Sequence, residues 1–315
     1  MVEVFHNQIH DNNSNTWGEG WGGGIYFHQS GGDCELAENE IYNNDLVVDV
    51  DDYHYGSGIM LMMNTAPVEV INNQIHDNGQ TDPSYQGSAI GCQYCTNQVI
   101  IQSNWLLDNE GDSALMLSYS SPFVQQNTII NPGASMGIFF GSGYTGQTMN
   151  LFSNIIARHQ WVNLYGMMSS MTDTTVTLMH NTLADSQVGL LVESSPGLGT
   201  FTVQFSNGIV SGHTDTGIAS TGPLTLMVND SLFHENDVDG VTGTNPLTGN
   251  PNFKSPVNYN YHLNRGSQAI DRIASGFGLD IDGDTRPYGS GETRFDAGAD
   301  EFIYSLFFFL PVTVR

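Results

Sequence analysis

Lysine and arginine are scarce in this chain and missing from its first half. Only seven of the 315 residues are lysine or arginine, against 33 aspartates and glutamates, and the first of the seven is Arg158. Residues 1–157 therefore carry 17 carboxylates and no lysine or arginine. Such a surface repels phosphate backbones, so we expect no nucleic-acid partner. An anionic glycan would need bridging cations to lie on it.

Cysteines and long apolar segments are also few. The pair Cys92 and Cys95 has the CxxC spacing but no second pair, which favours small residues in a turn, with a local disulfide, over a zinc site. The apolar tail at residues 302–314 is only thirteen residues long, and a helix needs about 20 to cross a bilayer. We expect no transmembrane span. We expect this tail either to retain the protein at a surface or to form a final strand.

Asparagine, in contrast, is abundant and marks a repeat. The sequence NQIHDN at residues 7–12 recurs at residues 73–78. Looser copies begin at Asn39, Asn104, Asn127, Asn154, Asn181, Asn207 and Asp230, at intervals of 23 to 34 residues. Self-similarity at this period predicts a solenoid, in which each short unit buries its apolar face against the next.

The repeated unit has the pattern of β-strands. Each asparagine follows a β-rich run, such as residues 68–71, and precedes an apolar residue two places on. A second marker, a small residue followed by an apolar one, comes later in each unit, as in Gly58-Ile59. Asparagine suits the corner between strands because it tolerates the left-handed backbone region. Stacked asparagines can also hydrogen-bond to one another along the column.

With these repeats the chain resembles the right-handed parallel β-helix proteins of the pectate-lyase-like superfamily. The resemblance covers residues 1–245 and implies an all-β, single-stranded solenoid of about nine to ten rungs with an irregular C-terminal cap. It does not imply one activity, because the class hosts many chemistries. The Gly-His-Gly set of polygalacturonases is not matched, since Thr214 follows Gly212-His213. Val2 to Phe5 already has the pattern of a strand, so we expect the N-terminal cap and an export signal to lie upstream, in a longer chain or surface assembly.

A different pattern begins near residue 246. Its ordered motifs include NPNF at 250–253, YHL at 261–263, SQAID at 267–271, DIDGDTRP at 280–287 and DAGADE at 296–301. Together they resemble the C-terminal module of bacterial choice-of-anchor Q proteins, which are secreted or surface proteins. Gln268 and Arg272 depart from that family's usual proline and glycine. We predict that residues 246–301 form final coils and a cap held by arginine and aspartate pairs, followed by the short tail at 302–315.

Aligning the first rungs by their asparagines produces columns of polar residues. The position five later is Asn12, Asn44, Asn78 and Asn109, and the two positions before it include His10, Asp11, His76, Asp77 and Asp108. Stacked rungs would place these side chains along one edge. His76, Asp77 and Asp108 are the candidate catalytic residues, because two carboxylates and a histidine can perform acid and base steps on a sugar. The alternative is that such corners are naturally rich in Asp and Asn and only satisfy backbone groups.

The first three rungs each carry an insertion after this corner. Their candidate carbohydrate-binding residues are Trp17, Glu19, Trp21, Tyr53, Tyr55 and Tyr85, because aromatic faces and carboxylates suit neutral sugars. Asp49, Asp51 and Asp52 are candidate calcium ligands. Asp280, Asp282 and Asp284 resemble half a calcium loop, although Pro287 breaks the alignment and favours a structural turn. Ca²⁺ is the one cofactor that these residues suggest.

These features favour a secreted or cell-surface β-helix protein that binds a polysaccharide through the inserted loops. Two alternatives stay open. One is a polysaccharide lyase, epimerase or glycoside hydrolase, and the sequence does not decide whether the protein is an enzyme. The other is a purely structural surface repeat.

Overall fold

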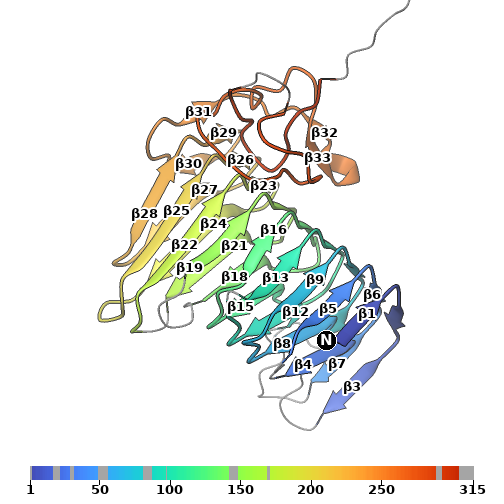
Figure 1. Ribbon diagram of the computed structural model, residues 1–315. Coiled ribbons are helices and arrows are strands. Elements are labelled where there is room, and N and C mark those ends of the chain that lie inside the picture. The colour runs from blue at the N-terminus through green and yellow to red at the C-terminus, as the bar shows by residue number, and fades with distance from the viewer. Residues whose placement is uncertain are drawn as a thin grey trace, which may run out of the picture.

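The chain winds into a right-handed parallel β-solenoid, as the repeat predicted (Figure 1). This computed structural model describes residues 2–16, 22–28, 32–48, 56–80, 87–96, 98–141, 148–168, 171–288 and 293–304. Each rung contributes one strand to each of three long sheets, and successive rungs pair in parallel and in register. Ile41, for example, pairs with Ile9 on one side and Ile75 on the other.

The first sheet precedes the first asparagine corner. In the described residues its nine strands are β1 (Val2–Phe5), β5 (Cys34–Ala37), β9 (Val68–Ile71), β13 (Val99–Gln102), β16 (Phe123–Gln125), β19 (Thr148–Phe152), β22 (Thr174–Met179), β25 (Phe201–Ser206) and β28 (Thr225–Asn229).

The second sheet lies between the two asparagine corners. Its ten described strands are β2 (Gln8–His10), β6 (Glu40–Tyr42), β10 (Gln74–His76), β14 (Trp105–Leu107), β17 (Thr128–Ile130), β20 (Ile155–Ala157), β23 (Thr182–Ala184), β26 (Ile209–Ser211), β29 (Leu232–His234) and β31 (Leu247–Thr248).

The third sheet returns each rung to the start of the next. Its nine described strands are β4 (Ile25–His28), β8 (Ile59–Met62), β12 (Ser88–Gln93), β15 (Ser113–Ser118), β18 (Met136–Phe140), β21 (Val162–Met168), β24 (Val188–Ser194), β27 (Thr216–Thr221) and β30 (Val238–Gly240). A short sheet in the first three rungs contains β3 (Asn13–Thr16), β7 (Asp45–Val48) and β11 (Gly79–Gln80).

Asparagine ladders hold both corners of the second sheet, which confirms the predicted columns. At the first corner, Nδ2 of Asn73 donates to Oδ1 of Asn104 at 3.0 Å and to the carbonyl of Leu36 at 2.8 Å. At the second corner, Nδ2 of Asn78 donates to Oδ1 of Asn109 at 2.9 Å. These amides are buried and satisfy backbone groups that would otherwise lack partners.

The expected reason for asparagine at the corner is wrong in one detail. At these two corners the left-handed residue is the one before the ladder asparagine: Asn72 (φ 56°) before Asn73 and Asp77 (φ 52°) before Asn78. The ladder asparagine therefore contributes its side-chain hydrogen bonds, while its neighbour makes the turn.

The core inside the solenoid is apolar and continuous from rung to rung. It contains the middle residue of the short second-sheet strands, such as Ile75, Leu106 and Ile129. Cys92 and Cys95 are buried free thiols, and Cys92 lies within strand β12. The expected local disulfide is not formed, because both thiols pack into the core; Cys95 itself lies beyond the end of β12, after a bend.

The segment after β31 folds back along the side of the solenoid. It contains a ribbon of two antiparallel strands, β32 (Phe253–Ser255) and β33 (Asn260–Leu263), joined through the 3₁₀ helix η1 (Pro256–Asn258). Figure 1 shows this C-terminal segment, in orange and red, alongside β23, β26 and β29. Among the described residues, no helix has the length and apolar character needed to cross a bilayer.

Contacts from the C-terminal segment reach far back along the rod. The hydroxyl of Tyr261 donates to Asp185 Oδ2 at 2.7 Å, and the amide of Gln126 donates to the carbonyl of Asp280 at 2.6 Å. The Ala299 N–H donates to the hydroxyl of Thr182 at 2.9 Å. The segment thus covers the outer side of several rungs instead of only closing the end of the stack.

A buried arginine organises the end of this segment. The side chain of Arg286 is fully buried, and its guanidinium lies 3.1 Å from Glu301 Oε2 and donates to the carbonyl of Gly298 at 2.9 Å. In the described part of the chain this is the single ion pair that an arginine or lysine makes with a carboxylate. The segment is therefore held by one arginine–glutamate pair, where the sequence had suggested arginine–aspartate pairs.

Candidate functional site

Alternation along each short strand decides which residues of the second sheet face outward. In β10 the middle residue Ile75 is fully buried in the core, while Gln74 and His76 on either side face away from it. The same alternation holds in the neighbouring strands, since Ile41, Leu106 and Ile129 are also core residues. The outer face therefore presents two columns of side chains, bordered by the corner residues that follow each strand.

In the first four rungs these outward columns are polar and aromatic, apart from Leu107. We call this surface the open strip; it comprises Gln8, Glu40, Gln74, Trp105, His10, Tyr42, His76, Leu107, Asp11, Asn43, Asp77 and Asp108. Within it the rings of His10, Tyr42 and His76 stack nearly parallel, with centroids 4.7 and 5.2 Å apart. Because the ring faces pair with one another, the column turns its ring edges and polar tips outward.

The three candidate catalytic residues lie together in the open strip. His76 Nδ1 is 2.7 Å from Asp77 Oδ2, and Nε2 is 3.3 Å from Glu40 Oε1. Partial burial and the nearby charge of Asp77 raise the pKa of Asp108, while Arg158 and His76 act against that rise. A carboxyl with a raised pKa beside a second carboxyl is an arrangement suited to acid–base chemistry.

Their placement also limits that chemistry. Asp77 and Asp108 occupy the same left-handed corner position on adjacent rungs, with φ of 52° and 50°. Rungs are about 4.8 Å apart, so both carboxylates border a bound sugar from the same side. Glycosidases instead place their two carboxyl groups on either side of the scissile bond. The arrangement expected from the sequence, with carboxylates across a sugar, is therefore not formed by this pair.

The open strip leads into a cavity where the C-terminal segment meets the sheet. This cavity, about 300 Å³ in volume, is lined by Trp105 on the sheet and by Tyr259, His262 and Asp282 on the segment. Trp105 is 49% exposed, so a large apolar surface faces solvent at the edge of the cavity. The guanidinium of Arg158 lies over the ring of Tyr259, 5.2 Å from its centroid.

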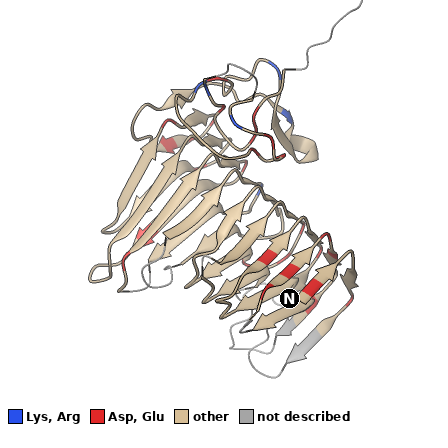
Figure 2. Ribbon diagram, in the orientation of Figure 1, with Lys and Arg blue, Asp and Glu red and all other residues tan. Residues whose placement is uncertain are grey.

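Charge is distributed unevenly around this region. Figure 2 shows lysine and arginine gathered in the C-terminal segment, while red carboxylates mark strands near the N-terminus. The residues that line the cavity do not follow this division, because their one carboxylate, Asp282, lies on the C-terminal segment.

The predicted wall of aromatic residues lies outside the described residues. This applies to Trp17, Glu19, Trp21, Tyr53, Tyr55 and Tyr85, and to the candidate calcium ligands Asp49, Asp51 and Asp52. The strands that precede the insertions are described: Asn13 pairs with Asp45, and Asp45 with Gly79. The three insertions therefore follow neighbouring strands of one short sheet.

The carboxylates of the suggested half calcium loop have different partners. Both oxygens of Asp280 accept backbone N–H groups, Oδ1 from Asp282 and Asp284 and Oδ2 from Glu301. Asp280 is fully buried and acts as the centre of a turn. The Asp282 side chain faces His262 instead, with 3.2 Å between Oδ1 and Nε2.

Sequence reasoning did not identify Trp105, Tyr259 or His262 as site residues. The sequence did contain a signal for Trp105. Alternation along the strand places this residue outward, in a rung that the repeated asparagines had already aligned. No comparable signal existed for Tyr259 and His262. They reach the cavity only because the C-terminal segment folds back beside rungs more than 100 residues earlier in the chain.

The fold is a parallel β-solenoid, and the early rungs of its second sheet have a solvent-exposed face. The family model described as right handed beta helix region matches residues 1–183, more than half of the chain, and the chain belongs to that family. No curated protein and no solved structure matches the chain. The family establishes the architecture but no activity, because function depends on the residues of the site.

Proposed function

We propose that this protein is a secreted or cell-surface β-helix protein that binds a polysaccharide along the open strip. The observation that carries the proposal is the half-exposed Trp105 at the cavity into which the strip leads. An aromatic surface beside fixed polar groups is the combination that sugars need, because it stacks on C–H faces while the polar groups fix the hydroxyls.

The length of the strip supports a chain-like ligand. Acceptors recur on successive rungs, because the corner column beside the stacked rings contains Asp11, Asn43, Asp77 and Asp108. Rungs repeat about every 4.8 Å, so a polymer that runs along the solenoid axis meets similar groups at regular intervals. The scarcity of lysine and arginine in this half favours a neutral glycan over an acidic one.

Affinity electrophoresis in gels containing neutral or acidic polysaccharides tests the proposal. We expect retention by a neutral polysaccharide. Trp105→Ala should weaken it about tenfold, equivalent to about 1.4 kcal/mol. Trp161→Ala is the matched control, because Trp161 is 37% exposed and lies beside the third sheet. Wild-type retention by Trp105→Ala would place binding elsewhere, and no retention by the wild type would leave the structural repeat as the better account.

A polysaccharide-active enzyme is the second candidate, favoured by the raised pKa of Asp108 next to Asp77. New reducing or unsaturated ends during incubation with the retained polysaccharide would establish it. Asp108→Asn should then abolish these ends and weaken retention only slightly, because it replaces one acceptor among several along the open strip. Retention without new ends in the wild type would reject catalysis and keep the binding proposal.

A further inference from the structure

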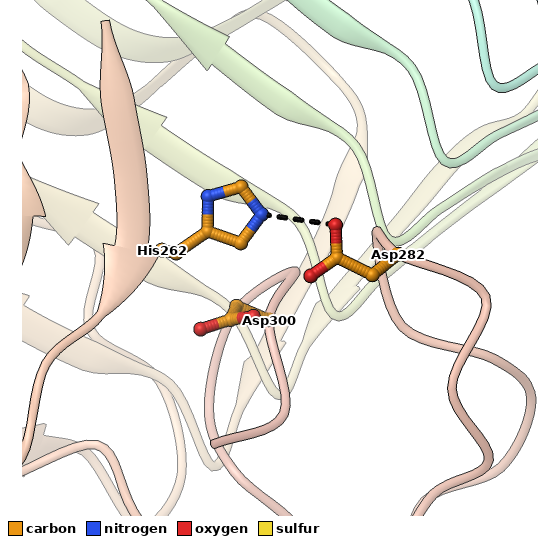
Figure 3. Close-up of side chains that lie close together, drawn as sticks. All are labelled: His262, Asp282 and Asp300. Atoms are coloured by element: carbon orange, nitrogen blue, oxygen red, sulfur yellow. Dashed lines mark hydrogen bonds and ion pairs between the residues drawn. The ribbon is translucent and has the colours of Figure 1, made fainter. Parts of the chain in front are cut away.

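Three metal-ligating side chains from separate parts of the C-terminal segment converge beside the cavity. Figure 3 shows His262 from β33, Asp282 from the turn after Asp280, and Asp300 from near the end of the described chain. One potential ligand atom from each lies within 4.8 Å of the others. They are separated by 20 and 18 residues in sequence, so the folding of the segment alone brings them together.

The hydrogen bonds of His262 determine which ring nitrogen carries a proton. Asn260 Oδ1 accepts the backbone N–H of His262 at 3.1 Å, which identifies this atom as the amide oxygen. The same oxygen lies 2.9 Å from His262 Nδ1, so Nδ1 carries a hydrogen and donates it. In a neutral imidazole, Nε2 then has a lone pair, and it faces Asp282 Oδ1 at 3.2 Å. The lone pairs of Nε2 and Oδ1 repel at this distance, so either a second proton on the ring or a metal ion must lie between the two atoms.

Asp300 adds a second carboxylate to the same point. It is only 5% exposed, and Oδ2 accepts the backbone N–H of Leu263. Among the described residues no donor is hydrogen-bonded to Oδ1. A second proton on His262 would balance one of the two carboxylates, whereas a divalent cation would balance both.

We propose that His262, Asp282 and Asp300 form a binding site for a divalent transition-metal ion of the zinc type. An imidazole nitrogen with two carboxylate oxygens suits zinc and its neighbours, while calcium and magnesium prefer oxygen ligands alone. Three protein ligands leave a coordination position for water or another group. His262 and Asp282 line the cavity, which gives the ion a route of entry.

The site differs from the calcium loop suggested by the sequence. It uses Asp282 but neither Asp280, whose oxygens accept backbone N–H groups, nor Asp284. Asp284 lies two residues from Asp282 in the same turn, so it provides a matched control for the loss of one carboxylate.

Zinc binding to the full, untagged chain after chelator treatment tests the site. We expect about one zinc ion per chain by calorimetry and elemental analysis, with no displacement by millimolar calcium. Asp282→Asn and His262→Gln should each weaken binding by roughly 10-fold to 100-fold or more, and Asp284→Asn should not. Circular dichroism must show the same folded signal in all variants.

A second measurement keeps the test independent of folding effects. Nitrogen-15 NMR of the wild-type histidine rings should show His262 retaining hydrogen on Nδ1 while zinc shifts the Nε2 resonance. A ring doubly protonated at pH 7 and unaffected by zinc would overturn the proposal. So would equal zinc binding by the wild type, Asp282→Asn and His262→Gln.

Discussion

The second sheet has the same three-residue strand in the early and the late rungs, but its outer face differs between them. In the early rungs Gln74 and Trp105 share one outward column and are exposed. Further along the same column, Ile155 and Ile209 are 1% exposed, because the C-terminal segment packs over them. One repeat therefore supplies both a solvent-facing surface and a docking surface, and the two differ in their outward residues.

The difference teaches that a solenoid can separate structure from function along its length. Inward residues are apolar in every rung and maintain the stack, so outward residues are free to vary. The late rungs use that freedom to hold the C-terminal segment. The early rungs present the open strip, and the cavity lies at the junction of the two regions.

Removing the buried charge of Arg286 from the C-terminal segment should have the largest effect on the free energy of unfolding. Arg286→Ala leaves Glu301 buried without its partner, which costs about 3–5 kcal/mol in the free energy of unfolding. Urea denaturation measures the loss, and hydrogen exchange should show faster exchange in β23 and β26. Arg265→Ala in the same segment is exposed and should change stability by less than about 0.5 kcal/mol. Equal stability of the two variants would contradict a role for the covering segment.

The same outward position can then be truncated in both regions. Ile155→Ala in the covered region should cost about 2–5 kcal/mol, since it leaves a cavity under the C-terminal segment. Gln74→Ala in the open strip should change stability by less than about 0.5 kcal/mol. Thermal and urea unfolding of both variants measure the difference. Similar costs would show that the segment does not pack on the sheet in solution.

The regions should also respond differently to acid. The corner that holds asparagines in the early rungs includes His159 and His213 among its late residues, and burial lowers the pKa of both to about 4. The unfolded chain protonates histidine near pH 6.5. These buried neutral histidines therefore do not weaken the fold above pH 6.5. As the pH falls towards 4, the free energy of unfolding decreases by at most about 3 kcal/mol for each histidine.

His159→Asn tests this response and restores the ladder residue type. The variant should lose less stability than the wild type between pH 6.5 and 4.5 in urea unfolding. Burial also raises the pKa of Asp296 to about 7, so stability from this group is lost as the pH rises from about 4 to about 7. The quantity to follow is thus the difference in the free energy of unfolding between variant and wild type at each pH. An unchanged difference across this pH range would refute the assignment.

The ladders show how much of the fold could be predicted from residues alone. Asn73 and Asn104 identified the first corner, and Asn78 and Asn109 the second. A buried amide needs hydrogen-bond partners, and at these corners the asparagine of the next rung supplies one. His159 shows where this reasoning ends. The ladder stops there, and the buried Nδ2 of Asn131 has no hydrogen-bond partner among the described residues.

The site could be predicted only in part. His76 and Asp77 were located because they belong to a repeat whose register is readable from the sequence. His262 and Asp300 were not, because their segment has no periodicity that places it against the sheet. A hint was present in the outward positions of the late rungs, where Ile130 and Ile155 are apolar and need a cover.

The sequence by itself determined the parallel solenoid, its two asparagine ladders and the acidic early rungs, because each follows from a local pattern repeated in register. Tertiary structure alone decided that the C-terminal segment folds back along the rod. That choice buries Tyr261 against Asp185, forms the cavity beside Trp105 and joins His262 with Asp282 and Asp300. Contacts between residues so far apart in the chain depend on the shapes of two packed surfaces, which no local pattern encodes.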